Sequence, residues 1–155
     1  MRNLSLLIVL LFCFTTLNIL AQSQKPKTQL VSFGKNVDSP LTIKEKDMLT
    51  EVYQGQLEKY ILSNPSRLKN MKHLLRNRIQ VIQMDGSTNS DKYINLSNVE
   101  LLDHYNENLL RDKVFNKNNF NPLKYNLPFF KIGGSMYKIY DTNYYLVIKT
   151  QTTKK

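Results

Sequence analysis

The side chains best suited to acid–base chemistry in this chain are its two histidines, His73 and His104. Asp103 precedes His104 and could orient the imidazole as a general base, although no nucleophile accompanies the pair. Ser135 follows two glycines but lacks the G-x-S-x-G context of a hydrolase nucleophile. Neither histidine has partners at the spacing of a metal site, so the sequence predicts no metal and no cofactor.

A second source of catalytic groups is the acidic side of a predicted helix, where we expect Glu45, Asp47 and Glu51 to face solvent. A glycoside hydrolase needs two carboxyl groups that face each other across a cleft. Lysines in the same helical turn indicate ordinary surface charge instead. The sequence therefore favours a protein without catalytic activity, and the alternative is a small enzyme that uses Asp103 and His104 or this acidic helix.

The chain is strongly basic, with 22 lysine and arginine side chains, 12 acidic side chains and a formal charge of +10. A candidate binding surface on and after a predicted second helix contains Arg67, Lys69, Lys72 and Arg76, with Arg78 beyond them. Anionic lipid headgroups or lipopolysaccharide would suit this patch in an exported protein, for which nucleic acid is excluded as a partner. The alternative is a solvated helix face without a partner.

The other candidate binding surface is a cluster of tyrosines near the C-terminal end: Tyr137, Tyr140, Tyr144 and Tyr145. Successive side chains of a strand point to opposite faces of the sheet, so Tyr144 and Tyr145 cannot both face the core. An exposed row of tyrosines could bind a peptide, a glycan or a partner protein. The alternative is cross-strand packing beneath the neighbouring asparagine-rich segment.

Two helices are predicted in the first half of the chain. Thr42 and Glu45 have the spacing of a capping box, and an apolar stripe of helical period follows them. Gly55 interrupts this helix, and we expect it to mark a close contact with another helix. Asn64 and Pro65 suit the N-cap and the first position of the second helix.

The clearest β signal is a hairpin near the C-terminus, with strands at residues 136–140 and 144–149 joined by turn-forming residues. A further strand is predicted at residues 79–84, where β-branched residues recur, and a shorter one within residues 93–102. We expect an α+β fold in which two N-terminal helices pack on a small antiparallel sheet that ends in this C-terminal β-hairpin.

The segment at residues 104–126 is rich in asparagine and also carries large apolar side chains. A disordered segment would not keep so many apolar residues. We therefore expect an ordered but irregular segment, with a turn of helix at residues 106–113.

The chain begins with the pattern of an export signal. Arg2 is the only charge before an apolar run at residues 4–20, which Ala21 and Gln22 follow. Polar residues interrupt the second half of the run, which disfavours a membrane-spanning helix. We expect cleavage before Gln22 and a periplasmic or extracellular location, and the alternative is a retained membrane anchor.

The predicted organisation is a signal peptide at residues 1–21, a flexible lead-in at 22–38, a single α+β domain at 39–151 and a basic tail at 152–155. Cleavage would remove Cys13, the only cysteine, and lower the formal charge from +10 to +9 because Arg2 is lost with it. The exported protein would then have no disulfide, no thiolate metal site and no cysteine nucleophile.

Three short motifs carry a resemblance: NPSRL at residues 64–68, FNPLKY at 120–125 and YKIYDTNYY at 137–145. With the Ala21–Gln22 junction and a composition heavy in asparagine, lysine and isoleucine, the chain resembles small exported proteins of unknown function from Gram-negative bacteria of the Bacteroidota group. The resemblance implies a periplasmic or envelope location and brings no known activity. We expect a non-enzymatic binding or accessory protein whose partner is a protein, peptide or glycan of the envelope, or an anionic lipid surface. In the alternative, the protein would be a small periplasmic enzyme.

Overall fold

The computed structural model describes residues 31–85 and 92–153, which belong to one compact unit. The predicted signal peptide, the first part of the lead-in (22–30) and the last two residues of the basic tail lie outside the described residues. The helices and strands occur in the order α2 (Ile43–Tyr53), α3 (Pro65–His73), β1 (Ile79–Gln83), β2 (Ile94–Asn95), β3 (Ser135–Lys138) and β4 (Tyr144–Ile148).

Helix α2 begins with the predicted capping box. The Glu45 amide donates to Thr42 Oγ1 at 3.2 Å, and the Thr42 amide donates to Glu45 Oε2 at 2.8 Å. The helix ends at Tyr53, because Gln54 adopts a left-handed φ of 43°. Such a backbone costs a residue other than glycine about 1–3 kcal/mol. The expected close helix contact at Gly55 is wrong, since a Cβ atom there would meet nothing within 4 Å.

The chain continues through a wide π-helical turn at Glu58–Leu62 and enters α3 at the predicted cap. Asn64 Oδ1 accepts from the Arg67 amide at 3.0 Å, and Pro65 occupies the first turn. A second π-helical turn, Leu74–Arg78, then leads directly into β1. The strand predicted at 79–84 is therefore present, and it follows the helix without a loop.

The four strands form one sheet in the order β1-β4-β3-β2. Strand β4 pairs antiparallel with β1 on one side and with β3 on the other, while β2 runs parallel to β3. The fold class is α+β as predicted, but the expected purely antiparallel sheet is wrong. The parallel pair requires β2 and β3 to be joined by a long crossover, and the asparagine-rich segment supplies it.

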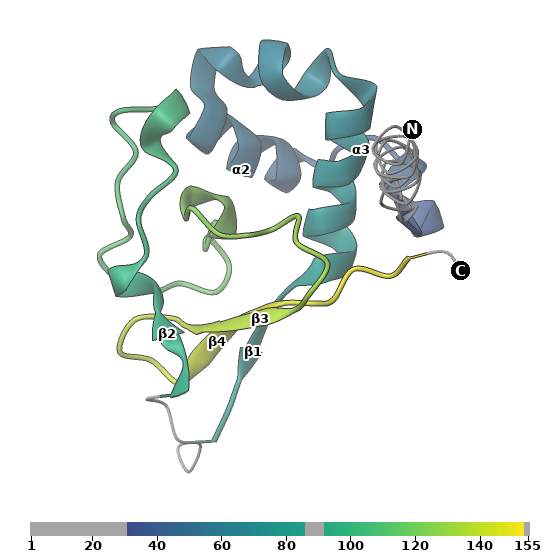
Figure 1. Ribbon diagram of the computed structural model, residues 1–155. Helices are drawn as coiled ribbons and strands as arrows, with labels where there is room; N and C mark the ends of the chain where they lie inside the picture. The colour runs from purple at the N-terminus through teal and green to yellow at the C-terminus, as the bar shows by residue number, and fades with distance from the viewer. Residues whose placement is uncertain (1–30, 86–91, 154–155) are drawn as a thin grey trace, which may run out of the picture. The chain divides into compact units, whose positions relative to one another are not determined.

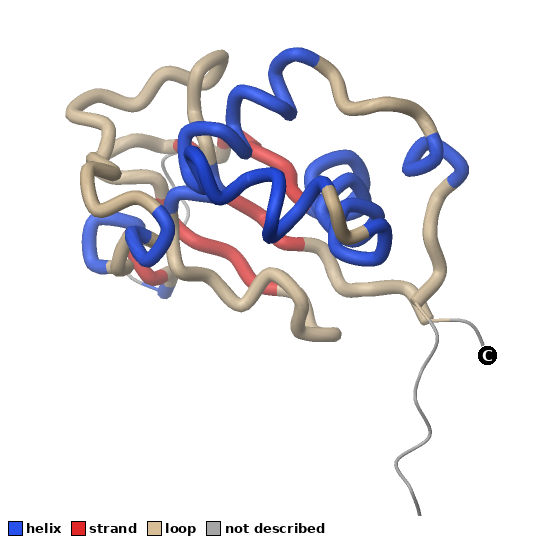
Figure 2. The backbone as a smooth tube through the Cα atoms, turned by 90° about the horizontal axis from the view of Figure 1, so that it is seen from above, coloured by secondary structure: helices blue, strands red, loops and turns tan. Residues whose placement is uncertain are grey.

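The helices lie on one face of the sheet, and the last part of the crossover segment, around Pro122–Lys124, lies between the helices and the sheet (Figure 1). Figure 2, viewed from above, shows the helices and loops in front of the strands. The core joins this layer to the sheet, since buried side chains of α2 and α3 are in one apolar cluster with those of β3 and β4. Members from these four elements include Leu49, Val52, Met71, Tyr137, Leu146 and Ile148.

The asparagine-rich segment is ordered and irregular, as expected, but the predicted helical turn at 106–113 is wrong. Single turns of 3₁₀ helix occur instead at Asp103–Tyr105 and Pro122–Lys124. Two asparagine amides hold the segment on α2: Asn106 donates to the Glu51 carbonyl at 2.8 Å and Asn121 to the Met48 carbonyl at 2.9 Å. The Glu51 carbonyl lies in the last turn of α2, where main-chain carbonyls have no partner within the helix.

Candidate binding cleft beside helix α3

The members of the predicted basic surface differ in exposure, and the half-buried Arg76 is bound within the protein. Its Nε and Nη2 atoms donate to the two oxygens of Glu45 at 2.6 and 2.7 Å, and Nη2 also donates to the Pro40 carbonyl at 2.7 Å. Glu45 is only 8% exposed, so its expected position on a solvent-facing side of the helix is wrong. Hydrogen bonding to Arg76 holds the pKa of Glu45 below its ordinary value.

Two other cations of the cluster are also used internally. Lys72 donates to the Ser39 carbonyl at 2.8 Å. Arg78 is 2% exposed and donates to the carbonyls of Lys149 and Lys131, both at 2.9 Å, and of Phe129. These side chains cannot present their charge to an external lipid surface, because their donors already bind the protein's own main chain.

Arg67 and Lys69 are the two exposed members of the predicted basic surface. Lys69 Nζ lies 3.6 Å from Asp38 and over the ring of Phe33. Arg67 Nη1 donates to the Tyr60 carbonyl at 3.3 Å. The two side chains thus contact different segments: the lead-in for Lys69, and the π-helical turn before α3 for Arg67.

The predicted tyrosine surface is divided between buried and half-buried positions. Tyr137 and Tyr145 are 8% and 3% exposed, and Tyr140 and Tyr144 are half-buried. The Tyr144 ring packs against Phe115 of the asparagine-rich segment at 5.0 Å between centroids. This is the packing that we considered as the alternative to an exposed row. Tyr140 joins it through its hydroxyl, which contacts that of the buried Tyr125.

The candidate catalytic groups do not converge in the described part of the chain. Asp103 and His104 are both exposed, and no hydrogen bond joins their side chains. His73 is buried, with its ring 5.1 Å from that of Phe33, and its Nε2 atom has no hydrogen-bond partner among the described residues. Burial, with the nearby charge of Arg78, lowers the pKa of His73. No group of three metal-ligating side chains occurs within 31–85 and 92–153.

A cleft of about 320 Å³ lies on the Arg67 side of α3. Its size falls at the lower end of the range of sites that bind small molecules. The walls come from the end of α2, the π-helical turn, α3, the turn at 103–105 and the loop before β3. The lining residues are Tyr53, Tyr60, Ile61, Arg67, Asn70, Met71, Tyr105 and Phe130.

Three tyrosines form the aromatic wall of this cleft. Tyr105 stands between the other two, with its ring centroid 4.7 Å from that of Tyr53 and 4.9 Å from that of Tyr60. Because the chain turns at Gln54, Tyr53 and Tyr60 come from two helical segments and still meet the same ring. Burial raises the pKa of Tyr53, so its hydroxyl stays protonated and can donate a hydrogen bond at neutral pH.

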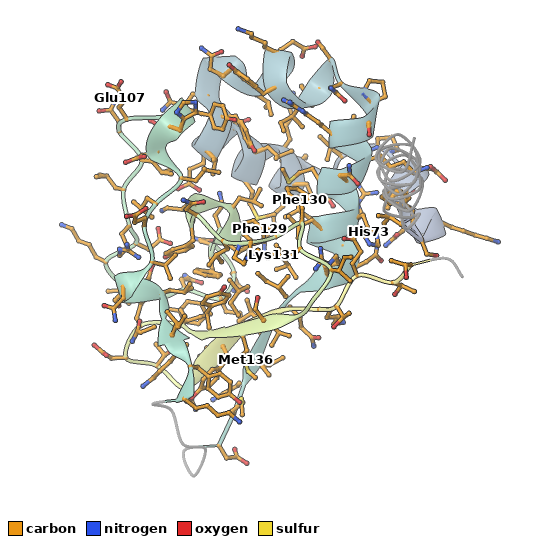
Figure 3. All side chains as sticks on the ribbon, viewed as in Figure 1. His73, Glu107, Phe129, Phe130, Lys131 and Met136 are labelled. Carbon is orange, nitrogen blue, oxygen red and sulfur yellow. The ribbon has the colours of Figure 1, made fainter. Side chains whose placement is uncertain are left out.

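The opposite wall carries Phe130, which is 57% exposed although it is a large apolar side chain. Figure 3 shows Phe129, Phe130 and Lys131 on the loop that passes between the helices and the sheet, with His73 on the other side of α3. Phe129 is buried, so this loop is anchored by one aromatic ring and presents the next. An exposed aromatic at the rim of a cleft is a common feature of binding sites.

The cleft continues in two directions. Inward, Tyr53, Met71 and Phe130 also line an apolar hollow of about 120 Å³, whose floor includes Leu102, Leu123 and Leu127. Outward, Tyr60 and Tyr105 also line a shallow groove of about 460 Å³. Its polar walls are rich in side-chain amides: Gln54, Gln56, Asn106 and Asn108.

Arg67 is the residue shared by the sequence-based candidates and this cleft. The sequence places Tyr53 and Tyr60 in an apolar helical stripe, which favours core positions, and it gives Tyr105 and Phe130 no distinguishing pattern. The sequence carried no signal that joins these rings, because they come from distant positions that only the fold brings together around Arg67. Tyrosine and arginine are enriched where proteins bind partners.

Comparison of the chain with protein-family models, with curated proteins and with solved structures gives no match. Within the described residues, every helix is too short or too polar to cross a bilayer.

Proposed function

We propose that the protein is a non-enzymatic, exported protein of the cell envelope that binds a partner molecule in the cleft beside α3. The cleft itself carries the proposal, because an aromatic wall, an exposed phenylalanine and an arginine converge there from five segments. A binding site is typically an apolar hollow with a few polar groups that fix the orientation of the ligand.

The leader sequence supports an envelope location, in the periplasm or outside the cell, with cleavage before Gln22. In this proposal the two N-terminal helices that pack on the sheet, and the hairpin that ends it, act as a scaffold. They hold the cleft walls while carrying no catalytic groups. Asp103 and His104 are both exposed, and no hydrogen bond joins their side chains among the described residues, which supports a binding function over catalysis.

Site-specific photocrosslinking in the producing cells tests the binding function. A benzophenone amino acid at Phe130 should give a discrete crosslinked product in the envelope fraction. The control position is Ile43, which is 83% exposed and does not line the cleft. Identical products from both positions, or none from Phe130, would contradict the proposal.

N-terminal sequencing of the protein from the same fraction tests the location. A first residue of Gln22 is expected. An intact Met1, or recovery of the protein in the cytoplasm alone, would reject export with cleavage.

A further inference from the structure

The charge that lines the cleft is positive. Arg67 is the charged residue of its lining, and no aspartate or glutamate lines it within the described residues. The adjoining groove adds Lys59 near Tyr60, with Glu107 as the carboxylate among its lining residues. The part of a ligand that lies beside Arg67 should therefore be anionic.

Most of the hydrogen-bond donors of Arg67 remain available to bind such an anionic group. A guanidinium carries five N–H donors in a planar fork, and here one nitrogen donates to the Tyr60 carbonyl at 3.3 Å. Asn70 lies one helical turn further along the same face of α3, and its amide has no hydrogen-bond partner among the described residues. Together they match a carboxylate, which accepts two hydrogen bonds from an arginine fork and a further one from an amide.

The inner hollow indicates which group of the ligand lies next to its carboxylate. It is lined mainly by apolar side chains, and its volume is about 120 Å³. An apolar cavity of about 150 Å³ accepts a benzene ring, so this hollow suits an aliphatic side chain somewhat better than an aromatic one. A neutral sugar would place hydroxyl groups there without partners, which is costly.

The outer groove indicates the chemistry of the part of the ligand that precedes its carboxylate. Side-chain amides both donate and accept hydrogen bonds, as does each peptide unit of an extended main chain. Asn106 already binds the Glu51 carbonyl. The three exposed amides of the groove, Gln54, Gln56 and Asn108, are thus suited to a main chain that leaves the cleft past Tyr60 and Tyr105. A fatty acid would instead place an alkyl tail on this polar surface.

We infer that the cleft binds the carboxyl-terminal end of an extended peptide with an aliphatic last residue. The terminal carboxylate binds Arg67 and Asn70, the last side chain fills the inner hollow, and the preceding residues follow the amide-lined groove. This inference rests on the proposed function, because it names the ligand class of the same cleft.

The test titrates the purified protein with an acetylated tetrapeptide of three alanines and a terminal leucine, using calorimetry or NMR. The same peptide with a carboxamide end is the comparison. The free acid should bind at least about tenfold more tightly, because a charge-assisted pair with Arg67 is lost in the amide. Equal affinities would overturn the role of the carboxylate.

Two variants on the same helix separate the local contact from general charge. Arg67→Gln should remove the preference for the acid, whereas Lys69→Gln should leave it unchanged, since Lys69 is exposed on α3 but does not line the cleft. An equal loss in both variants would show that only net charge matters and would overturn the inference. Circular dichroism of each variant confirms that it is folded.

The outcomes also separate this inference from the proposed function. If neither peptide binds while the benzophenone at Phe130 still captures a partner, the peptide class is wrong and the binding function stands. If a soluble oligosaccharide binds and the tetrapeptide does not, the ligand is a glycan and the inference is overturned. Loss of crosslinking as well would reject both.

Discussion

The two sides of the helical stretch from Pro65 to Arg78 use the same kind of side chain in opposite ways. Towards the lead-in and the sheet, Arg78 is buried and Arg76 is half-buried, and their donors bind Glu45 and main-chain carbonyls. Towards the cleft, Arg67 is exposed and most of its donors remain available. A run of cations in a sequence therefore does not identify a binding surface until the structure shows which of them already bind the protein itself.

The largest effect that sharpens this comparison is expected from Arg78→Met. The substitution keeps an apolar stem of similar length but leaves the buried carbonyl of Phe129 and the part-buried carbonyls of Lys131 and Lys149 without their donor. It should lower the free energy of unfolding by about 3–5 kcal/mol. Urea denaturation measures the loss, with the exposed Arg67→Met as the matched control at under about 0.5 kcal/mol. Similar losses of stability in both variants would contradict the difference between the internally bound arginines and the exposed one.

A somewhat smaller, pH-dependent effect is expected from Glu45→Gln. Pairing with Arg76 lowers the pKa of Glu45 in the folded protein from the ordinary 4.5. The stability that this carboxylate adds is therefore fully present above about pH 4.5 and is lost as the pH falls through the folded pKa. The wild-type protein should be more stable than the variant by about 2 kcal/mol at pH 7, and the difference should vanish in acid.

The control for this measurement is Glu107→Gln. Glu107 lies exposed on the loop beside the groove (Figure 3). A difference between wild type and Glu45→Gln that stays constant from pH 7 to pH 3 would show that the ion pair does not act as described.

Two kinds of prediction from the sequence differ in how far they depend on remote residues. The caps at Thr42 and Asn64 are correct because each involves only residues one helical turn apart. The internal hydrogen bonds of Arg76 and Arg78 could not be foreseen, because their partners, Glu45 and main-chain carbonyls, belong to distant segments. The parallel pairing of β2 is non-local in the same way.

The cleft is the most non-local feature of all. Its aromatic residues Tyr53, Tyr60, Tyr105 and Phe130 come from segments that only the folded chain brings together. In the sequence, the same rings have the spacing of core residues or no pattern at all. Only Arg67 stood out beforehand, and for a different reason, as a member of a basic cluster.

A third prediction concerns the lead-in side at milder acidity. Burial and the charge of Arg78 lower the pKa of His73 from 6.5, so the imidazole is neutral when folded, against Phe33 and near Lys69. The unfolded chain binds a proton more readily, and stability falls as the pH drops below 6.5 towards the folded pKa. His73→Phe should remove about 1 kcal/mol of this pH dependence. Urea denaturation at pH 7 and at pH 5.5 compares the two proteins, and an unchanged pH dependence in the variant would contradict the prediction.

The smallest effect on stability is expected on the cleft side, from Phe130→Ala. The ring is 57% exposed, so its removal should change the free energy of unfolding by less than about 1 kcal/mol. The same variant should weaken peptide binding by about tenfold, because the ring forms one wall of the cleft. A large loss of stability with unchanged binding would mean that the two sides of α3 do not differ as described.

The place of β4 in the sheet also determines when the protein can fold. Strand β4 lies between β1 and β3, and its residue Ile148 pairs with Ile79 at the start of β1. The sheet therefore lacks the strand that joins β1 to β3 until almost the whole described chain has been synthesised. Pairing strands that are so distant in the sequence slows folding. Any fragment of the chain that ends before Tyr144 lacks the strand that pairs with both β1 and β3, so the described sheet cannot close in it.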